Sequence, residues 1–201
     1  MELLNLNAIP IAHDKNVYNI TQKELDVIKK STYRPSQKGH SVSQSIYLLN
    51  HKTLLPLKKF MLKKAKQYTR DVLEISDEIY MTQSWSTINI TNAFHKTHAH
   101  PNTLISLVYY AQCKDGFIFF DVTTSSIRKG FNFLYTIKNY NIYNSDNWTL
   151  KVQTGDIVLF PGNLRHGSSV NKSSIPRIAV GANFFIKGKL GSVDSVSSII
   201  I

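Results

Sequence analysis

The chain has 201 residues, 42% of them hydrophobic and 11% aromatic, which is enough for one domain with a buried core and too apolar for a disordered chain. A single cysteine excludes an internal disulfide framework and fits a reducing compartment. The N-terminal residues lack the charged and apolar regions of a signal peptide, and no run of about eighteen apolar residues could span a membrane. We therefore expect one cytoplasmic domain, residues 1–201, with no membrane contact.

The formal net charge of +11 at pH 7 is the unusual bulk property, and it raises the question of a polyanionic partner such as nucleic acid. Much of this charge falls between residues 52 and 70, where lysines interleave with apolar residues in a helical pattern. Such a pattern is typical of the solvated face of an amphipathic helix. Because no aromatic cluster that could stack on bases lies beside it, we favour the solvated face over a nucleic-acid site.

Up to residue 78 we expect an N-terminal strand and helices that pack on a sheet. Thr21 and Glu24 form a capping box, which opens a helix through about Lys30. The longest helical pattern runs from residue 54 to 75, with Pro56 tolerated in its first turn. The other expectations are an edge strand or extended arm at 3–11, a loop at 31–44 and a short strand at 45–49.

From residue 79 to 190, short β-branched and aromatic runs alternate with turn signals, and the turns at 114–116 and 154–156 are typical of hairpins. Some eight strands at this spacing predict a double-sheet jelly roll, the double-stranded β-helix, so the fold class is mainly β with flanking N-terminal helices. The tail at 191–201 is either a closing strand or a frayed end. The expected strands are 80–90, 103–112, 117–121, 132–137, 148–153, 157–160, 166–170 and 177–185.

Three of the seven histidines, His95, His98 and His100, fall within residues 94–101. Side chains alternate along an extended strand, so His98 and His100 should share one face. Two neutral imidazoles this close suit a transition metal, and no cysteine lies nearby to build a structural metal site. The alternative is a polar strand end whose histidines face water.

His166 follows an apolar strand at 157–160 and a turn at Pro161 and Gly162. Hairpin geometry would bring it onto the same sheet surface as an earlier strand. A single histidine is more often a buried, hydrogen-bonded residue or an exposed one than a metal ligand. Together with His98 and His100 in a jelly roll, we expect it to be the third ligand of a metal site.

The strand at 177–184 has two unlike faces. One holds apolar side chains, and the other holds Arg177 among small or polar residues. Small residues beside one arginine indicate a cavity wall, with the guanidinium placed to bind a carboxylate in a fork. The alternative is an edge arginine paired with an acidic loop. The apolar face consists of Ile178, Val180, Ala182 and Phe184, and the other of Arg177, Ala179, Gly181 and Asn183.

With these motifs the sequence resembles the small 2-oxoglutarate/iron(II)-dependent oxygenases common in marine phages and bacteria, which carry a His-x-His-Pro motif. The resemblance covers about the last half of the chain, and Arg177 lies eleven residues after the distal histidine, close to the usual spacing. It rests on Trp85, His98-Ala99-His100-Pro101, Ser106-Leu107-Val108-Tyr109-Tyr110, Gly155-Asp156, Phe160-Pro161, His166, Arg177-Ile178-Ala179 and Asn183.

The resemblance implies an enzyme that couples oxidative decarboxylation of 2-oxoglutarate, with oxygen, to oxidation of a prime substrate, most simply its hydroxylation. Iron(II) would be held by His98, His100 and His166, and Arg177 would bind the far carboxylate of the co-substrate. Tyr110 and Asn183 would complete the co-substrate pocket.

One position departs from the superfamily pattern, which has a carboxylate where this chain has His100. Asp121 or His95 therefore remains an alternative second ligand, and three imidazoles would equally suit zinc or copper.

Two other readings stay open. A cupin-type metalloenzyme that uses no 2-oxo acid also has a His-x-His motif, but it usually has a glutamate where Leu104 stands and does not require Arg177. A non-enzymatic, basic jelly-roll binding module would use the lysines and not the histidines. The prime substrate cannot be read from the loops at 31–44 and 123–130. The apolar tail at 199–201 is consistent with a homodimer contact.

Overall fold

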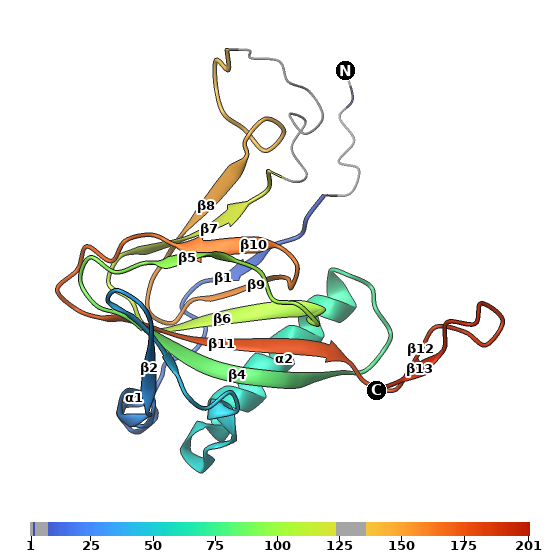
Figure 1. Cartoon of the computed structure of the whole chain (residues 1–201), viewed down its shortest axis with the longest axis horizontal. Coiled ribbons are helices and arrows are strands. Elements are labelled where there is room, and N and C mark those ends of the chain that lie inside the picture. Colours follow the sequence, from blue (N-terminus) through green and yellow to red (C-terminus); the bar gives the residue numbers. More distant parts are fainter. Residues whose placement is uncertain (1, 3–7, 124–135) are drawn as a thin grey trace.

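The computed structural model describes residues 2, 8–123 and 136–201, and two antiparallel sheets that face each other form its body (Figure 1). The larger sheet has the order β1 (Ala12–Asp14), β9 (Ile157–Pro161), β6 (Ile105–Gln112), β11 (Arg177–Ile186), β4 (Ile79–Asn89), β3 (His40–Ser43) and β2 (Tyr33–Gln37). The smaller sheet has the order β5 (His95–His98), β10 (Arg165–Ser168), β7 (Gly116–Asp121) and β8 (Asn147–Val152). This confirms the predicted mainly β, double-sheet fold.

Two helices from the N-terminal part flank the larger sheet, α1 (Gln22–Lys30) and α2 (Leu55–Asp71). The capping box is confirmed, because the Thr21 hydroxyl accepts from the Glu24 backbone N–H and the Glu24 carboxylate accepts from that of Thr21. Figure 1 shows α2 lying across one face of the larger sheet. The buried residues of α2 recur at three- and four-residue spacing, so one stripe of the helix packs on the strands: Leu57, Met61, Ala65 and Tyr68.

Each face of the larger sheet packs against a different layer. The outer face, with Val180 and Phe184 of β11, shares one core with α2. The inner face meets the smaller sheet in a second, smaller core that includes Phe120 and Phe160. Because successive strand residues point to opposite faces, β11 contributes to the first core with its even-numbered positions and to the space between the sheets with its odd-numbered ones.

The turns at 114–116 and 154–156 are not hairpins, which corrects the sequence prediction. The first leads from β6 to β7 and the second from β8 to β9, so each carries the chain from one sheet to the other. Turn residues signal that the chain reverses, but they do not say which strands then pair. Glycine is required at position 116 because two side chains lie close to its backbone: a Cβ there would lie 2.8 Å from Cys113 Sγ and 3.1 Å from Arg177 Nη1.

The region predicted as a loop at 31–44 instead holds β2 and β3, a hairpin that extends the larger sheet next to β4. β2 forms the edge of the sheet, and most residues of the hairpin are polar, so the alternation that marks a buried strand is missing. The predicted strand at 45–49 is an isolated bridge at Tyr47 followed by the short 3-10 helices η1 (Leu48–Asn50) and η2 (Lys52–Leu54). The predicted strand at 132–137 and the arm at 3–11 fall largely outside the described residues.

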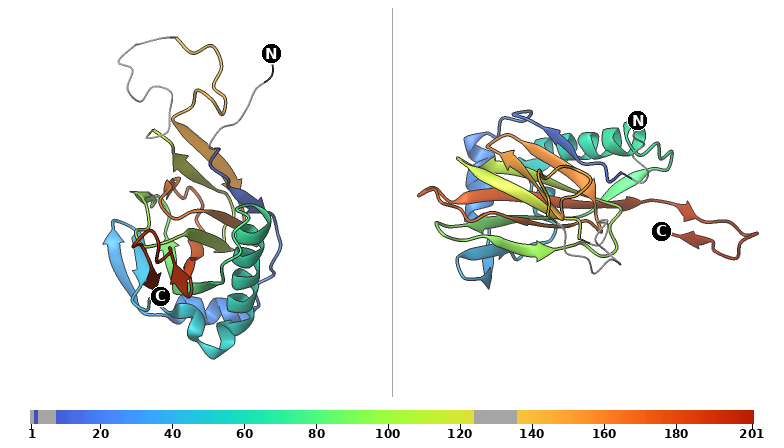
Figure 2. Two further views of the ribbon diagram at one scale, coloured as in Figure 1. Left: turned by 90° about the vertical axis from the view of Figure 1, so that its right-hand side faces the viewer. Right: turned by 90° about the horizontal axis from the view of Figure 1, so that it is seen from above.

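The tail forms a separate hairpin of β12 (Lys189–Leu190) and β13 (Ile199–Ile200), which projects from the body and does not close either sheet (Figure 2). Several of its apolar side chains are exposed, Val196 to 94% and Ile200 to 84%. The homodimer contact at this tail stays a prediction. Within the described part of the chain, neither helix has the length and apolar character that a membrane crossing needs.

Candidate functional site

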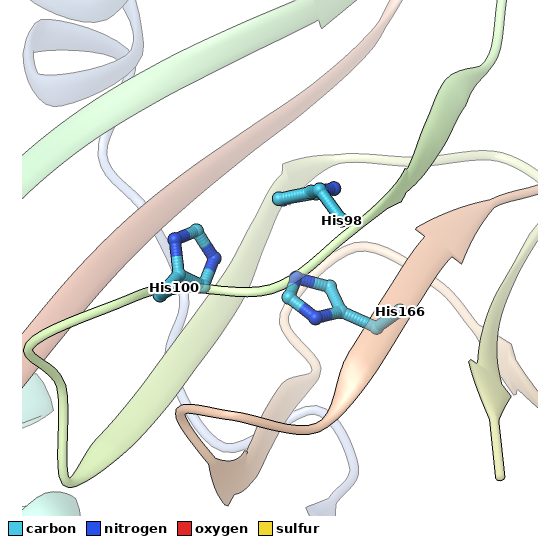
Figure 3. Close-up of side chains that lie close together, drawn as sticks. All are labelled: His98, His100 and His166. Atoms are coloured by element: carbon cyan, nitrogen blue, oxygen red, sulfur yellow. The ribbon is translucent and has the colours of Figure 1, made fainter. Parts of the chain in front are cut away.

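Three histidine side chains from two segments converge between the two sheets. His98 ends β5 and is the direct cross-strand partner of His166 on β10, while His100 lies two residues beyond the end of β5. One ring nitrogen from each lies within 4.8 Å of the others. Figure 3 shows the three rings arranged around one common space. Their convergence agrees with the sequence prediction, whereas their role as ligands remains a prediction.

Backbone carbonyls orient two of these rings. The Nδ1 atom of His98 lies 2.9 Å from the Lys96 carbonyl oxygen, and the Nδ1 atom of His166 lies 2.9 Å from that of Leu164. A carbonyl can only accept, so each Nδ1 carries the proton and each Nε2 keeps its lone pair. This outer hydrogen bond is the usual support of a metal-binding histidine.

Burial keeps the cluster uncharged at neutral pH. It lowers the pKa of His166 to about 3 and that of His100 to about 4, with further lowering from the neighbouring His98 imidazole. Burial also lowers the pKa of His98. Three neutral imidazole nitrogens in one small space are the donor set that iron(II), zinc or copper accepts, so the residues present fit a transition-metal ion.

The two alternative ligands lie outside this cluster. The His95 ring stacks on His98 at 4.1 Å and on His40 at 4.2 Å between ring centroids, but its nitrogens do not join the other three. Asp121 pairs across the strands with Arg165, next to the pair of Phe120 and His166, and so it points to the opposite face. Its carboxylate accepts from Arg165 Nε at 3.2 Å. The geometry therefore favours His100 over both.

A narrow cavity of about 60 Å³ adjoins the histidine cluster between the sheets. The prediction that the small-residue face of β11 forms a cavity wall is confirmed for Arg177, Ala179 and Gly181. A Cβ at position 181 would lie 2.7 Å from the Trp85 indole, so only glycine lets this ring lie against the strand. The lining residues are Trp85, Thr87, Asn89, His95, His98, His100, Val108, Tyr110, Ile118, His166, Gly167, Ser168, Arg177, Ala179 and Gly181.

Arg177 is a buried cation without an acidic partner among the described residues. Only 4% exposed, it donates from Nη2 to Ser168 Oγ at 2.8 Å and to the Ser169 carbonyl at 2.5 Å. The alternative of an edge arginine paired with an acidic loop is therefore wrong. Burial lowers the pKa of Arg177, which reflects the cost of an uncompensated charge, and a bound carboxylate would remove that cost.

The two other predicted co-substrate residues lie in different places. Tyr110 lines the cavity, and burial raises its pKa, so its hydroxyl keeps the proton and can donate it. Asn183 is six residues along β11 from Arg177, and its side-chain oxygen accepts from Ser106 Oγ at 2.9 Å. It lines not the cavity but an open groove that His100 also lines.

This groove is about 620 Å³ in volume and has hydroxyl, carboxamide and aromatic groups along its walls. Among the described residues that line it, none is a lysine, arginine, aspartate or glutamate. The groove and the cavity share one lining residue, His100, so both spaces adjoin the histidine cluster. The groove is lined by Tyr80, Thr82, Gln83, His100, Pro101, Asn102, Thr103, Asn183, Phe185 and Ile201.

The basic region lies on α2, which packs on the outer face of the larger sheet and so faces away from the cavity. Its cations include Lys66, 4.0 Å from a Glu78 oxygen, and Arg70, whose Nε lies 2.7 Å from an Asp71 oxygen. Such exposed pairs contribute little to stability. The preference for a solvated face over a nucleic-acid site stays a prediction.

Four polar residues in or beside the cavity lining escaped the sequence reasoning: His40, Asn89, Ser168 and Ser169. Ser168 could have been found, because it lies two residues after His166 on the same strand and therefore on the same face. His40 gave no signal, since it lies in a polar segment without strand alternation.

Comparison with known proteins points to one family. Residues 83–183, half of the chain, match the family described as "Putative 2OG-Fe(II) oxygenase". A comparison with curated proteins finds no match.

Solved structures share the fold at very low identity, and they show the fold alone. The epimerase SnoN from nogalamycin biosynthesis aligns with a TM-score of 0.62 and 11% identity over 90% of this chain and 77% of its own. HygX from Streptomyces hygroscopicus, solved with nickel, 2-oxoglutarate and hygromycin B, aligns at 0.59 and 11% over 88% and 82%. An oxidoreductase of the 2OG-Fe(II) oxygenase family from Burkholderia pseudomallei aligns at 0.56 and 10% over 81% and 75%.

Proposed function

The chain belongs to the 2OG-Fe(II) oxygenase family, and from this premise we propose that it is a hydroxylase in which His98, His100 and His166 hold the iron. Family membership brings with it iron(II) as the cofactor and 2-oxoglutarate and oxygen as co-substrates, and it sets aside both the cupin-type enzyme and the non-enzymatic binding module. The observation that carries the assignment of residues is one cavity that joins three neutral imidazoles to a buried guanidinium without an acidic partner in the described part of the chain.

When bound, iron(II) supplies the activation of oxygen that the oxidation of an unreactive C–H bond needs. His98 and His166 offer Nε2 lone pairs whose direction is already fixed by the hydrogen bonds on Nδ1. His100 adds a third neutral donor in place of the carboxylate that the wider superfamily carries. The three proposed ligands of this protein would therefore carry one negative charge fewer than those of the wider superfamily.

Arg177 and Tyr110 recognise the co-substrate. The Arg177 guanidinium binds the distal carboxylate of 2-oxoglutarate and so gains an anion that no described residue supplies. Tyr110, protonated because of its burial, donates its hydroxyl hydrogen within the same cavity. Trp85, Val108 and Ile118 form apolar walls that limit the entry of water.

The prime substrate reaches the centre along the open groove that shares His100 with the cavity. Because this groove lacks charged side chains among its described lining residues, in a protein of net charge +11, it favours an uncharged substrate with hydrogen-bonding groups. Asn183 and Gln83, direct partners across β11 and β4, offer two carboxamides to such a substrate. Replacement of Asn183 decides whether this residue contacts the co-substrate or the prime substrate, because only the ligand that it contacts should then bind more weakly.

The test is formation of succinate by metal-stripped protein to which iron(II) and 2-oxoglutarate are returned. We expect turnover that depends on both additions, and its loss by at least about 100-fold in His166→Ala. The matched control is Lys63→Ala, an exposed change on α2 away from the cavity, which should leave turnover unchanged. Turnover that survives in His166→Ala would contradict the assigned ligand set.

A further inference from the structure

A row of three buried polar side chains crosses the inner face of the larger sheet, and two of them, Asn89 and Arg177, line the cavity. His40 on β3 is the cross-strand partner of Asn89 on β4, and Asn89 is that of Arg177 on β11. His40 is fully buried, and the other two are 4% exposed. Ser168 faces this row from β10 of the smaller sheet and contacts two of its members.

The hydrogen bonds of Asn89 have one direction. Its Nδ2 donates to Ser168 Oγ at 3.2 Å, which leaves Oδ1 to accept from His40 Nδ1. His40 Nε2 has no hydrogen-bond partner among the described residues, so no acceptor favours the tautomer that carries the proton on Nε2 over the one that carries it on Nδ1. His40 thereby fixes which side of the Asn89 amide faces the serine.

Ser168 Oγ receives more hydrogen bonds than it can accept well. Asn89 Nδ2, the His95 backbone N–H at 2.9 Å and Arg177 Nη2 at 2.8 Å all donate to it, although a hydroxyl oxygen has two lone pairs. Its own proton has no acceptor among the described residues. One donor can therefore turn to another acceptor at little cost, and the hydroxyl proton is available. Ser168 and Arg177 both line the cavity, where a ligand can meet them.

We propose that Ser168 is a second contact to the distal carboxylate of 2-oxoglutarate, and that Asn89 and His40 are the residues that position it. This inference rests on the proposed function. As the carboxylate enters, Arg177 Nη2 moves its hydrogen bond from Ser168 to a carboxylate oxygen, and the Ser168 hydroxyl donates to the same group. Asn89 and the His95 N–H then satisfy the two lone pairs of the serine, so the bound state has neither an excess of donors nor a free proton.

The test compares two 2-oxo acids by calorimetry under nitrogen, with manganese(II) in the metal site: 2-oxoglutarate, and 2-oxobutyrate, which lacks the distal carboxylate. We expect Ser168→Ala to weaken binding of 2-oxoglutarate about tenfold and that of 2-oxobutyrate less than about twofold. Ser168→Thr keeps the hydroxyl and should restore most of the affinity. Asn89→Ala should give a similar selective loss, and Asn89→Asp a larger one, because its carboxylate would pair with Arg177 in place of the ligand.

The matched control is Ser86→Ala, a fully buried serine of β4 that bonds Tyr33 on the other face of the sheet, and it should change neither affinity. Equal losses for the two acids in Ser168→Ala, or no loss, would overturn the proposal. If that variant does not fold, His40→Phe preserves the ring beside His95 and should show a selective loss of about threefold; an unselective loss or none counts against the proposal. Wild-type protein that binds no 2-oxoglutarate would instead refute the proposed function.

Discussion

The two faces of the larger sheet are built from the same strands, but the outer face forms a hydrophobic core and the inner face lines the candidate site. On β11 the outer positions, such as Val180 and Phe184, are fully buried against the layer that contains α2. The inner positions, such as Arg177 and Gly181, line a narrow cavity, and the Arg177 guanidinium has no acidic partner among the described residues. The outer face gains stability from apolar burial, whereas the inner face gives up packing and bears a desolvated cation. The period of two along a strand lets one segment of sequence serve both purposes.

The strongest test of the inner face is at its histidine cluster. His98→Ala removes one of the three proposed metal ligands and should lower iron-dependent turnover by at least about 100-fold. His100→Asp, in contrast, places a carboxylate where the wider superfamily has one, and we expect it to retain turnover within about tenfold of the wild type. Succinate formation and metal content per chain measure both effects. If His100→Asp and His98→Ala lose turnover equally, position 100 does not accept a carboxylate ligand.

The outer face should respond in the opposite way. Phe184→Ala removes a fully buried ring from the core beside α2 and should lower the free energy of unfolding by about 3–5 kcal/mol. Equilibrium unfolding in urea measures this loss. The affinity for 2-oxoglutarate of the fraction that remains folded should stay unchanged, because the ring does not reach the cavity. A change in affinity comparable to the loss of stability would break the separation between the faces.

Two neighbouring positions on β11 allow a closer comparison. Gly181→Ala places a Cβ 2.7 Å from indole carbons of Trp85, and such overpacking costs about 1–3 kcal/mol and displaces the cavity wall. Ala182→Gly, one residue on and on the outer face, costs about 1 kcal/mol through backbone entropy and a lost methyl contact. We expect turnover to fall about tenfold in the first variant only, at a temperature where both are folded. Equal turnover in the two variants would show that the Trp85 ring can move to make room for the added Cβ without disturbing the cavity.

The sequence predicts the outer face and the central strands well, because buried alternation is a property of local sequence. It also brings out His98, His100, His166 and Arg177, whose residue types are costly to bury without a purpose. It fails where the outcome depends on partners distant in the chain. The turns at 114–116 and 154–156 look like hairpins, yet the pairing of β6 with β9 and β11 carries them between sheets.

The row behind Arg177 was beyond sequence reasoning for a related reason. His40 reaches the site only because β2 and β3 join the sheet edge, and a polar edge strand looks like a loop. Its hydrogen bond to Asn89 joins residues 49 positions apart. Local pattern cannot supply such a contact, whereas the registers of β3, β4 and β11 place it directly.

The pH dependence of stability in the metal-free protein gives a further comparison of the two faces. Burial lowers the pKa of His166 to about 3 and that of His100 to about 4, from an ordinary value near 6.5. The folded state therefore binds fewer protons than the unfolded chain, so the stability is complete above pH 6.5 and declines as the pH falls toward these values. Each imidazole contributes a slope of about 1.4 kcal/mol per pH unit. Urea unfolding between pH 7 and 5 measures the slope, and His166→Phe should reduce it by about one imidazole's share. An unchanged slope in that variant would mean that His166 gains its proton in the folded state, and the inner face would then be more open to water than the outer one.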